Sequence, residues 1–221
     1  MHRIILREIS ALTHDTNRLV FTRPEGYEFS PGQATDFALD QDGWREETRP
    51  FTFTSQPDEA TLEFVIKSYP DHDGVTKRIA DLRPGDTVLI DQPWGAIQDH
   101  GPGIFIAGGA GITPFIPILR KRARHNKLSG CTLIFSNKTE RDIILREEWE
   151  GMPGLECIFV LTEENGRNVP RQEITADFLK ANVPDWGGHI YICGPPPMIE
   201  AVEKAVKSLG VSDEHIVTEE A

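Results

Sequence analysis

Cysteine is scarce in this sequence of 221 residues, which contains only Cys131, Cys157 and Cys193. Three thiols cannot all pair, and none stands in a CxxC or iron–sulfur spacing, so we expect neither a disulfide framework nor a metal cluster. The segment Asp71-His72-Asp73-Gly74 begins like a calcium loop but lacks the later ligands that such a loop requires. The sequence therefore predicts no metal site.

Long apolar runs are missing as well. Stretches such as Ile104–Ala107 and Ile190–Cys193 fall far short of the roughly 20 apolar residues that cross a bilayer. The N-terminus turns polar directly after Leu6, which argues against a signal peptide. We expect a protein without a membrane span, located in the cytoplasm.

Basic side chains are outnumbered, with 23 Lys and Arg against 35 Asp and Glu and a net charge of −12. Nucleic acid is therefore not an expected partner, because neutralising its phosphates requires a basic surface. Residues 1–100 carry 10 basic and 18 acidic side chains, and residues 101–221 carry 13 and 17. The first part is the more acidic, which opposes docking of acidic proteins there.

Alternating apolar segments separated by turn signals fill residues 1–100. This pattern predicts six short strands and one helix near Val75–Leu82, arranged as a small antiparallel β-barrel. The predicted strands are Arg3–Ile9, Leu19–Thr22, Ala34–Leu39, Phe51–Thr54, Leu62–Lys67 and Thr87–Asp91.

The pattern changes after a possible hinge at Gly101-Pro102-Gly103. Residues 101–221 alternate apolar strands with helical stretches, which predicts a second, α/β domain with a parallel sheet and helices on both faces. The predicted strands are Ile104–Ala107, Thr132–Ser136, Ile158–Thr162, Ile190–Cys193 and His215–Thr218. The predicted helices lie near Pro114–Arg124, Leu145–Glu150, Ile174–Ala181 and Pro197–Leu209.

Two turns of this second domain each join a strand to a helix. The first, Gly108–Pro114, has the pattern G-x-G-x-x-P, in which glycines let the backbone approach a pyrophosphate at a helix N-terminus. The second, Cys193–Met198, places a cysteine beside Gly and Pro. One glycine-rich turn can be a plain connection that binds nothing. Two such turns at one sheet edge favour a slot for a flat, extended ligand.

A second group of candidate ligand-binding residues lies in the predicted barrel. Arg49-Pro50-Phe51-Thr52 offers an arginine for a phosphate, an aromatic ring on the same side of the strand and a hydroxyl group. Gly74-Val75-Thr76 precedes the predicted helix and can form an anion site, flanked by Lys67 and Tyr69. The alternatives are a surface arginine beside a core phenylalanine and an ordinary helix cap.

Taken in their order along the chain, from Arg49–Thr52 and Gly74–Thr76 to the two turns of the second domain, these four motifs and a C-terminal Glu219 resemble the ferredoxin–NADP reductase superfamily. The resemblance covers nearly the whole chain. The resemblance implies a flavin-binding barrel followed by an NAD(P)-binding domain. It implies that Arg49 holds the flavin phosphate, that Phe51 packs on the flavin, and that the Ile66–Lys67 backbone lines its pyrimidine side. It implies catalytic roles for Thr52, Cys193 and Glu219. The cofactor-binding residues that it implies are Arg49, Pro50, Phe51, Thr52, Ile66, Lys67, Tyr69, Gly74, Val75, Thr76, Gly109, Gly111, Thr113, Pro114, Asn137, Asp142, Gly194, Pro195 and Met198.

The sequence departs from the family at two points. Phe51 stands where the family usually has Tyr, so one hydrogen bond to the flavin is lost while the packing can remain. Many members also place an aromatic residue near the C-terminus, and here the sequence ends in Ala221. We therefore expect a more open flavin face, or a different aromatic residue covering it.

The loop after the second α/β strand bears on the choice of dinucleotide. The stretch Phe135–Leu145 resembles the corresponding stretch of cytochrome b5 reductases, which use NADH. Asp142, with Glu140, would repel the 2′-phosphate of NADPH, whereas Lys138 and Arg141 could attract it. The resemblance of this loop and its acidic residues favour NADH over NADPH. FAD is expected rather than FMN because FAD is usual in the family that the sequence resembles.

The expected activity is hydride transfer from NADH to FAD and onward electron transfer to a separate acceptor. That acceptor is a flavodoxin, a ferredoxin, a heme protein, an oxygenase component or a small oxidant. The acidic barrel half gives no support to ferredoxin. The alternatives are a flavin-binding regulatory or sensor subunit without turnover, and an α/β binding protein without flavin.

Overall fold

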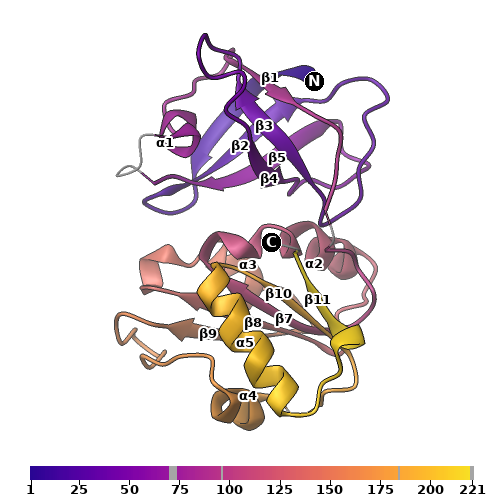
Figure 1. Cartoon of the computed structure of the whole chain (residues 1–221), viewed down its shortest axis with the longest axis vertical. Helices are drawn as coiled ribbons and strands as arrows, with labels where there is room; N and C mark the ends of the chain where they lie inside the picture. Colours follow the sequence, from indigo (N-terminus) through magenta and orange to yellow (C-terminus); the bar gives the residue numbers. More distant parts are fainter. Residues whose placement is uncertain (70–73, 96, 184, 220–221) are drawn as a thin grey trace. The chain divides into compact units, whose positions relative to one another are not determined.

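The computed structural model describes residues 1–69, 74–95, 97–183 and 185–219. The chain forms two compact units, Met1–Gly95 and Ala96–Ala221 (Figure 1). Most of the segment considered as a calcium loop, Asp71–Asp73, lies outside the described residues. Among the helices of the described chain, none has the length and apolar character needed to cross a membrane.

The first unit is an antiparallel sheet of six strands in the order β4-β3-β6-β1-β2-β5. A bridge between Phe53 and Phe64 joins its two outer strands and curls the sheet into a barrel. The predicted six-stranded antiparallel barrel is confirmed. Its elements are β1 (His2–Ala11), β2 (Thr16–Thr22), β3 (Ala34–Leu39), β4 (Arg49–Thr52), β5 (Thr61–Lys67), α1 (Val75–Ile79) and β6 (Thr87–Ile90).

Aromatic rings fill the barrel because alternate strand residues point inward. Phe37 of β3 meets Phe21 and Phe64 edge-to-face, with ring centroids 5.8 and 5.6 Å apart. Phe51 of β4 joins this core through its contact with Phe37, at 5.4 Å and an interplanar angle of 88°. The core therefore fixes the orientation of Phe51, which keeps part of its surface exposed.

The second unit is a parallel sheet of five strands in the order β11-β10-β7-β8-β9. Its strands are β7 (Gly103–Gly108), β8 (Cys131–Asn137), β9 (Leu155–Leu161), β10 (His189–Cys193) and β11 (Ile216–Thr218). Its α-helices are α2 (Phe115–Arg124), α3 (Arg146–Glu150), α4 (Ala176–Asn182) and α5 (Pro196–Ser208), and its 3₁₀ helices are η1 (Gly109–Ile112), η2 (Glu140–Asp142) and η3 (Asp213–His215).

Helices cover both faces of this sheet, as predicted. On one face, Phe105 of β7 meets Phe115 of α2, with ring centroids 5.4 Å apart. On the other face, Ile106 and Ile192 pack in a cluster with Leu179 of α4 and Val206 of α5. Successive residues of each strand thus serve opposite faces.

The order of the strands creates a switch point. From β7 the chain moves outward through β8 and β9, then returns to the other side of β7 for β10 and β11 (Figure 1). Ligands of open α/β sheets bind outside the carboxyl ends of the strands where the order reverses. Here the reversal lies between β7 and β10, the two strands that lead into the glycine- and proline-rich turns.

The tripeptide Gly101-Pro102-Gly103 lies inside the second unit rather than between the two. The Tyr191 hydroxyl donates to the Gly101 carbonyl at 2.9 Å. Gly103 opens β7, and a Cβ there would lie 2.0 Å from the His189 carbonyl oxygen. The glycine therefore serves close strand packing at the amino end of the sheet.

Three histidine rings gather at this amino end. The ring of His189 lies 5.4 Å from that of His100 and 5.8 Å from that of His215, centroid to centroid. Burial lowers the pKa of His189, and the neighbouring His100 and His215 lower it further. The folded chain therefore disfavours the protonated form of His189.

We expect the second unit to lose stability as the pH falls from about 7.5 to about 5. A lowered folded pKa gives stability that is present above the unfolded value of 6.5 and is lost as the pH drops through the folded pKa. Thermal unfolding at several pH values should show a decrease on the order of 2 °C. His189→Gln should reduce this pH dependence, whereas His125→Gln, at the exposed residue that follows α2, should not. An unchanged pH profile in His189→Gln would contradict the assignment.

Candidate functional site

The two turns at the switch point lie in direct contact. A Cβ at Gly108 would come within 2.4 Å of the Met198 Sδ, and a Cβ at Gly111 within 2.3 Å of the Cys193 carbonyl oxygen. A larger residue at Gly111 would meet backbone atoms and push the turns apart, whereas at Gly108 the Met198 and Pro195 side chains would have to move. The structure thus brings together the predicted Gly111, Cys193, Gly194 and Met198.

Gly109 differs from these two glycines because a side chain at this position would point into open space. It has φ +51°, and within the described chain nothing lies within 4 Å of a Cβ built there. Gly109 begins η1, and no described side chain caps the η1 N-terminus. The first amides of η1 therefore lack a side-chain partner at an open backbone surface, which fits a pyrophosphate. Thr113 and Pro114 follow and lead into α2.

Cys193 and Glu219 are neighbours because β11 runs parallel to β10, with Thr218 beside Ile192. The Cys193 thiol and the Glu219 carboxyl group lie close enough for each to change the pKa of the other. Burial raises the pKa of Cys193 far above its usual range, and the charge of Glu219 adds to this. Partial desolvation of its carboxyl group also raises the pKa of Glu219, although the residue as a whole is exposed. Cys193 is therefore a neutral thiol and not a thiolate nucleophile.

Asn137 ends β8 at the same sheet edge. Its side chain is 5% exposed, yet its Nδ2 and Oδ1 atoms have no hydrogen-bond partner in the described part of the chain. Leaving a buried amide unpaired costs about 1–3 kcal/mol, so such groups call for a partner. This orphaned amide fits a site that a polar ligand completes.

Asp142 has a structural task that its predicted binding role did not include. Its carboxylate accepts hydrogen bonds from the Thr139 amide at 2.9 Å and from the Thr139 hydroxyl at 2.5 Å. The bond from the Thr139 amide, together with one from the Asp142 amide to the Thr139 side chain, forms a capping box around η2. The spacing Thr139-x-x-Asp142 is the signal that could have revealed it. A contact between Asp142 and ribose stays a prediction.

In the barrel, β4 holds the Arg49–Thr52 motif. The Arg49 side chain is 51% exposed, and it donates to the Thr48 carbonyl at 2.6 Å and lies 3.7 Å from the Glu47 carboxylate. Pro50 is exposed beside it, and Thr52 is buried opposite Ala34 of β3. An exposed guanidinium with one weak ion pair can be redirected to a phosphate.

The bridge between Phe53 and Phe64 sets β4 against β5, so Thr52 and Ile66 lie toward the same end of the barrel. Ile66 is buried, and the Lys67 ammonium lies 3.0 Å from the Asp15 carboxylate. The Lys67 side chain is thus held by Asp15, and its predicted contribution to a ligand is through the backbone. Tyr69 is 45% exposed.

Gly74 precedes α1 in extended conformation, with φ −138°. Among the described residues, no side chain caps α1, and none lies within 4 Å of a Cβ built on Gly74. Val75 is buried in the barrel core and Thr76 is half-buried. These features fit the close approach of a phosphate to the first turn of α1.

Comparisons with known proteins agree with these two sites. Residues 3–98 match the oxidoreductase FAD-binding domain family, and residues 105–204 match the oxidoreductase NAD-binding domain family. NADH-cytochrome b5 reductase 1 of Aspergillus terreus is 32% identical over 229 residues, which cover 93% of this chain and 77% of that protein. The chain belongs to the ferredoxin–NADP reductase and cytochrome b5 reductase family.

Two further similarities extend the range of relatives. The ferredoxin–NAD(P)(+) reductase component of the naphthalene 1,2-dioxygenase system of Pseudomonas putida is 27% identical over 94% of this chain and 65% of its own length. The solved CS-b5R domains of human Ncb5or, in the NAD+ form, match with a TM-score of 0.85 and 25% identity over 98% of this chain and 68% of that one. The relatives are longer: this chain spans 62% of NADH-cytochrome b5 reductase 2 of Mycosarcoma maydis.

Membership of this family confirms that the chain is an NAD(P)H-dependent flavoprotein oxidoreductase with FAD- and NAD-binding domains. The individual binding and catalytic residues stay predictions, supported by the geometry above. Glu163 and Glu164, in the acidic loop after β9, were not among the site residues predicted from the sequence. Their side chains contact residues of the loop after β8, which a local sequence pattern does not reveal.

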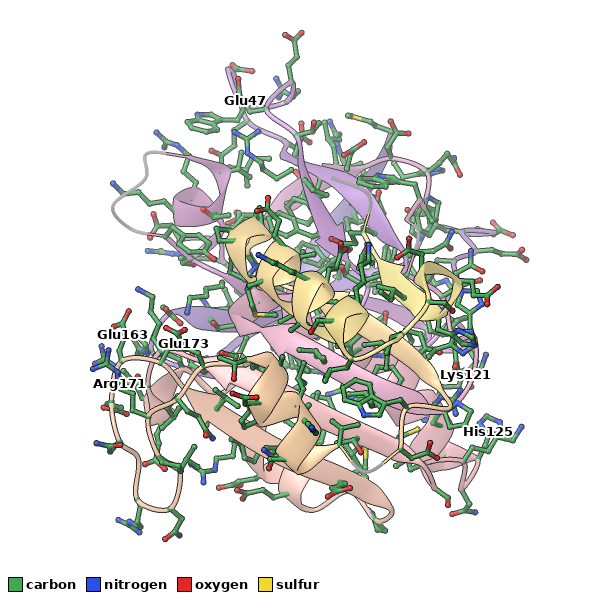
Figure 2. All side chains as sticks on the ribbon, turned by 60° about the horizontal axis from the view of Figure 1, so that its bottom comes forward. Glu47, Lys121, His125, Glu163, Arg171 and Glu173 are labelled. Atoms are coloured by element: carbon green, nitrogen blue, oxygen red, sulfur yellow. The ribbon has the colours of Figure 1, made fainter. Side chains whose placement is uncertain are left out.

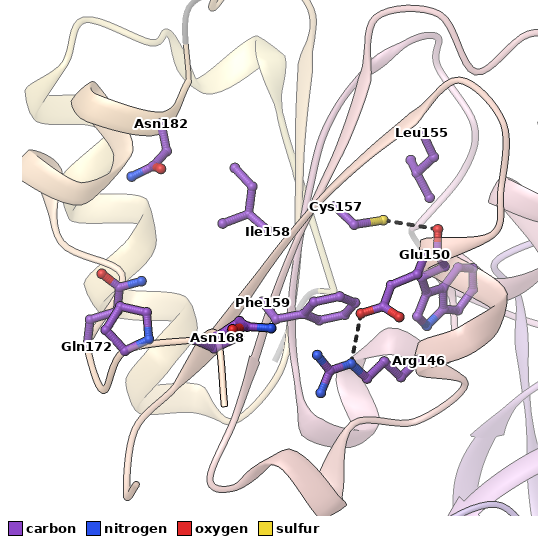
Figure 3. Close-up of a pocket in the computed structure, with 12 residues that line it drawn as sticks. Arg146, Glu150, Leu155, Cys157, Ile158, Phe159, Asn168, Gln172 and Asn182 are labelled. Carbon is purple, nitrogen blue, oxygen red and sulfur yellow. Dashed lines mark hydrogen bonds and ion pairs between the residues drawn. The ribbon is translucent and has the colours of Figure 1, made fainter. Parts of the chain in front are cut away.

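The second unit of this reductase also has an open hollow of about 740 Å³ beside β9 (Figure 3). On its wall, the Arg146 guanidinium lies 2.8 Å from the Glu150 carboxylate, and the Cys157 thiol donates to the Trp149 carbonyl at 3.4 Å. Its described lining contains none of the predicted site residues. We assign no part of the nucleotide site to it.

Proposed function

We propose that this chain transfers a hydride from NADH to bound FAD and passes the electrons to a separate acceptor. The observation that carries the proposal is the contact of the Gly111 turn with the Cys193 turn at the switch point of the second sheet. This contact forms a site for the dinucleotide in the second unit. In the barrel, the exposed Arg49 and the uncapped α1 helix can bind the phosphate groups of the flavin.

The residues have separable tasks in this reaction. The amides of Gly109 and Gly111 hold the dinucleotide pyrophosphate, and the Asn137 amide supplies a buried hydrogen-bonding group beside it. Arg49 and the first turn of α1 hold the flavin phosphates, and the half-buried face of Phe51 supports the ring system. Bound FAD supplies the two-electron chemistry. The protein supplies position and orientation.

The Cys193–Glu219 pair acts as a hydrogen-bonding unit at the nicotinamide end of the site. The raised pKa of Cys193 keeps its thiol protonated, and the charge of the Glu219 carboxylate contributes to that shift. A carboxylate at this end of the site would favour the positive charge that develops on the nicotinamide ring when it gives up a hydride. A third candidate, Thr52, contributes a buried hydroxyl group in the barrel.

The choice of NADH over NADPH rests on the loop after β8. Its acids, the buried Asp142 and the Glu140 paired with Arg146, offer no cation to a 2′-phosphate, and the fungal relatives are named NADH-cytochrome b5 reductases. For the acceptor, we propose a separate redox protein, since relatives are named for cytochrome b5 and for the ferredoxin of a dioxygenase system. A heme protein or an oxygenase component fits best, because the acidic first unit opposes acidic carriers.

Anaerobic mixing of the purified, FAD-loaded protein with NADH tests the proposal. We expect the flavin absorbance to bleach within seconds and the kcat/KM for NADH to exceed that for NADPH. A flavoprotein that does not bleach would be a sensor or regulatory subunit, and the reductase proposal would be wrong. A folded protein that takes up neither FAD nor FMN would support an α/β binding protein without flavin.

A further inference from the structure

The loop that follows β9 runs along the loop that follows β8. The Thr162 amide donates to the Asn137 carbonyl at 3.0 Å, and the Glu163 amide donates to the Lys138 carbonyl at 3.0 Å. These bonds extend the parallel pairing of β8 and β9 beyond the ends of the strands. Glu163 is thereby held next to Lys138, at the carboxyl edge of the sheet.

Side-chain contacts lock the two loops further. The Glu140 amide donates to the Glu164 carboxylate at 2.7 Å, and the Glu140 carboxylate accepts from the Arg167 amide at 3.2 Å. The same Glu140 oxygen lies 3.1 Å from the Arg146 guanidinium. A Cβ at Gly166 would come within 2.7 Å of the Glu140 carboxyl carbon. The position of Glu163 is therefore set by the fold of both loops.

Glu163 forms an ion pair with Lys138. The Lys138 ammonium lies 3.0 Å from the Glu163 carboxylate, and the two side chains are 70% and 56% exposed. The hydrogen bond with Glu163 is the main reason why the pKa of Lys138 is raised. Lys138 is therefore fully charged, and its charge is compensated by a carboxylate that sequence reasoning had not connected to it.

This position is where the second strand of a nucleotide-binding sheet meets the adenosine ribose. An acid there pairs with the ribose hydroxyl groups, and a cation there accepts a 2′-phosphate. Lys138 and Arg141 are the two cations of the loop after β8. The ion pair engages one of them and places another negative charge where a 2′-phosphate would have to enter.

We propose that Glu163 is a specificity-determining residue that disfavours 2′-phosphorylated dinucleotides by holding Lys138. The inference rests on the proposed function, because it assumes that the dinucleotide occupies the carboxyl edge of this sheet. The effect is set by an exposed ion pair and is therefore moderate and dependent on salt.

The experiment compares two probes, adenosine 2′,5′-bisphosphate and 5′-AMP, binding to the purified FAD-loaded protein by calorimetry at low ionic strength. We expect Glu163→Gln to bind the bisphosphate about three- to fivefold more tightly, with little change for 5′-AMP. Adding Lys138→Ala to Glu163→Gln should remove the gain. The ratio of kcat/KM for NADPH to that for NADH should rise in parallel.

Glu173→Gln is the matched control, because it removes an exposed acid from the same region without touching Lys138. Figure 2 labels Glu163, Arg171 and Glu173 in this region. The Arg171 Nε donates to the Thr162 carbonyl at 2.9 Å. An equal gain in Glu173→Gln, or no gain in Glu163→Gln while 5′-AMP still binds, would overturn the proposal. Failure of every variant to bind 5′-AMP would instead overturn the dinucleotide site itself, and this inference with it.

Discussion

Arg49→Ala is expected to weaken FAD binding by about 10- to 100-fold, because a charge-assisted bond from arginine to phosphate is worth about 1.5–3 kcal/mol. Among the described residues, the exposed Arg49 guanidinium contacts the Thr48 carbonyl and, at 3.7 Å, the Glu47 carboxylate. Removing the guanidinium should therefore weaken FAD binding without destabilising the fold. Flavin content after gel filtration and a titration of the apoprotein with FAD would measure the loss.

Arg45→Ala provides the control for the overall charge. Arg45 lies four positions before Arg49 and has a similar exposure, 48% against 51%. Its guanidinium is held by Asp40 and Asp42 at 2.7 and 2.6 Å, so it is already committed to carboxylates. We expect Arg45→Ala to keep its FAD. Equal loss in both variants would show a general charge effect, and full FAD retention in Arg49→Ala would contradict the role of Arg49.

The strands of both units could be predicted because alternation and turn residues are local signals. Errors fell at the strand ends, where burial is partial. β4 begins at Arg49 and not at Phe51, since Arg49 pairs with Phe37 of the neighbouring strand β3. β9 begins at Leu155, three residues before the predicted Ile158, since it pairs with Cys131 at the start of β8. Pairing between distant strands set both ends, and a local pattern does not contain it.

The same limit explains what was missed in the site. Contact between the two turns follows from the strand order, in which β10 lies beside β7. The sequence could place both turns at one edge, but it could not show that Gly111 touches Cys193. The ion pair of Lys138 with Glu163 likewise joins two loops that are separated by α3 and β9. Asp142 was the reverse case, because its bonds to Thr139 are local and the T-x-x-D spacing was visible.

Gly111→Ala is expected to disable the dinucleotide site while the barrel keeps its FAD. The added Cβ would lie 2.3 Å from the Cys193 carbonyl oxygen and 2.6 Å from the Gly194 Cα, and both of these neighbours are backbone atoms. Overpacking of this kind costs about 1–3 kcal/mol or more. Anaerobic reduction of the bound flavin by NADH should slow by at least about tenfold, since about 1.4 kcal/mol corresponds to a factor of ten. Stopped-flow absorbance would measure the rate, and flavin content would show that the first unit is intact.

Gly109→Ala separates steric displacement of the turns from loss of glycine as such. Gly109 has φ +51°, so alanine there costs about 1 kcal/mol of backbone strain. In the described chain, however, its Cβ would meet nothing within 4 Å. We therefore expect chemical denaturation to show a clearly larger loss of stability for Gly111→Ala than for Gly109→Ala. Equal losses would mean that backbone conformation, and not contact between the two turns, determines the need for glycine. The two turns would then not act as one rigid nucleotide-binding wall.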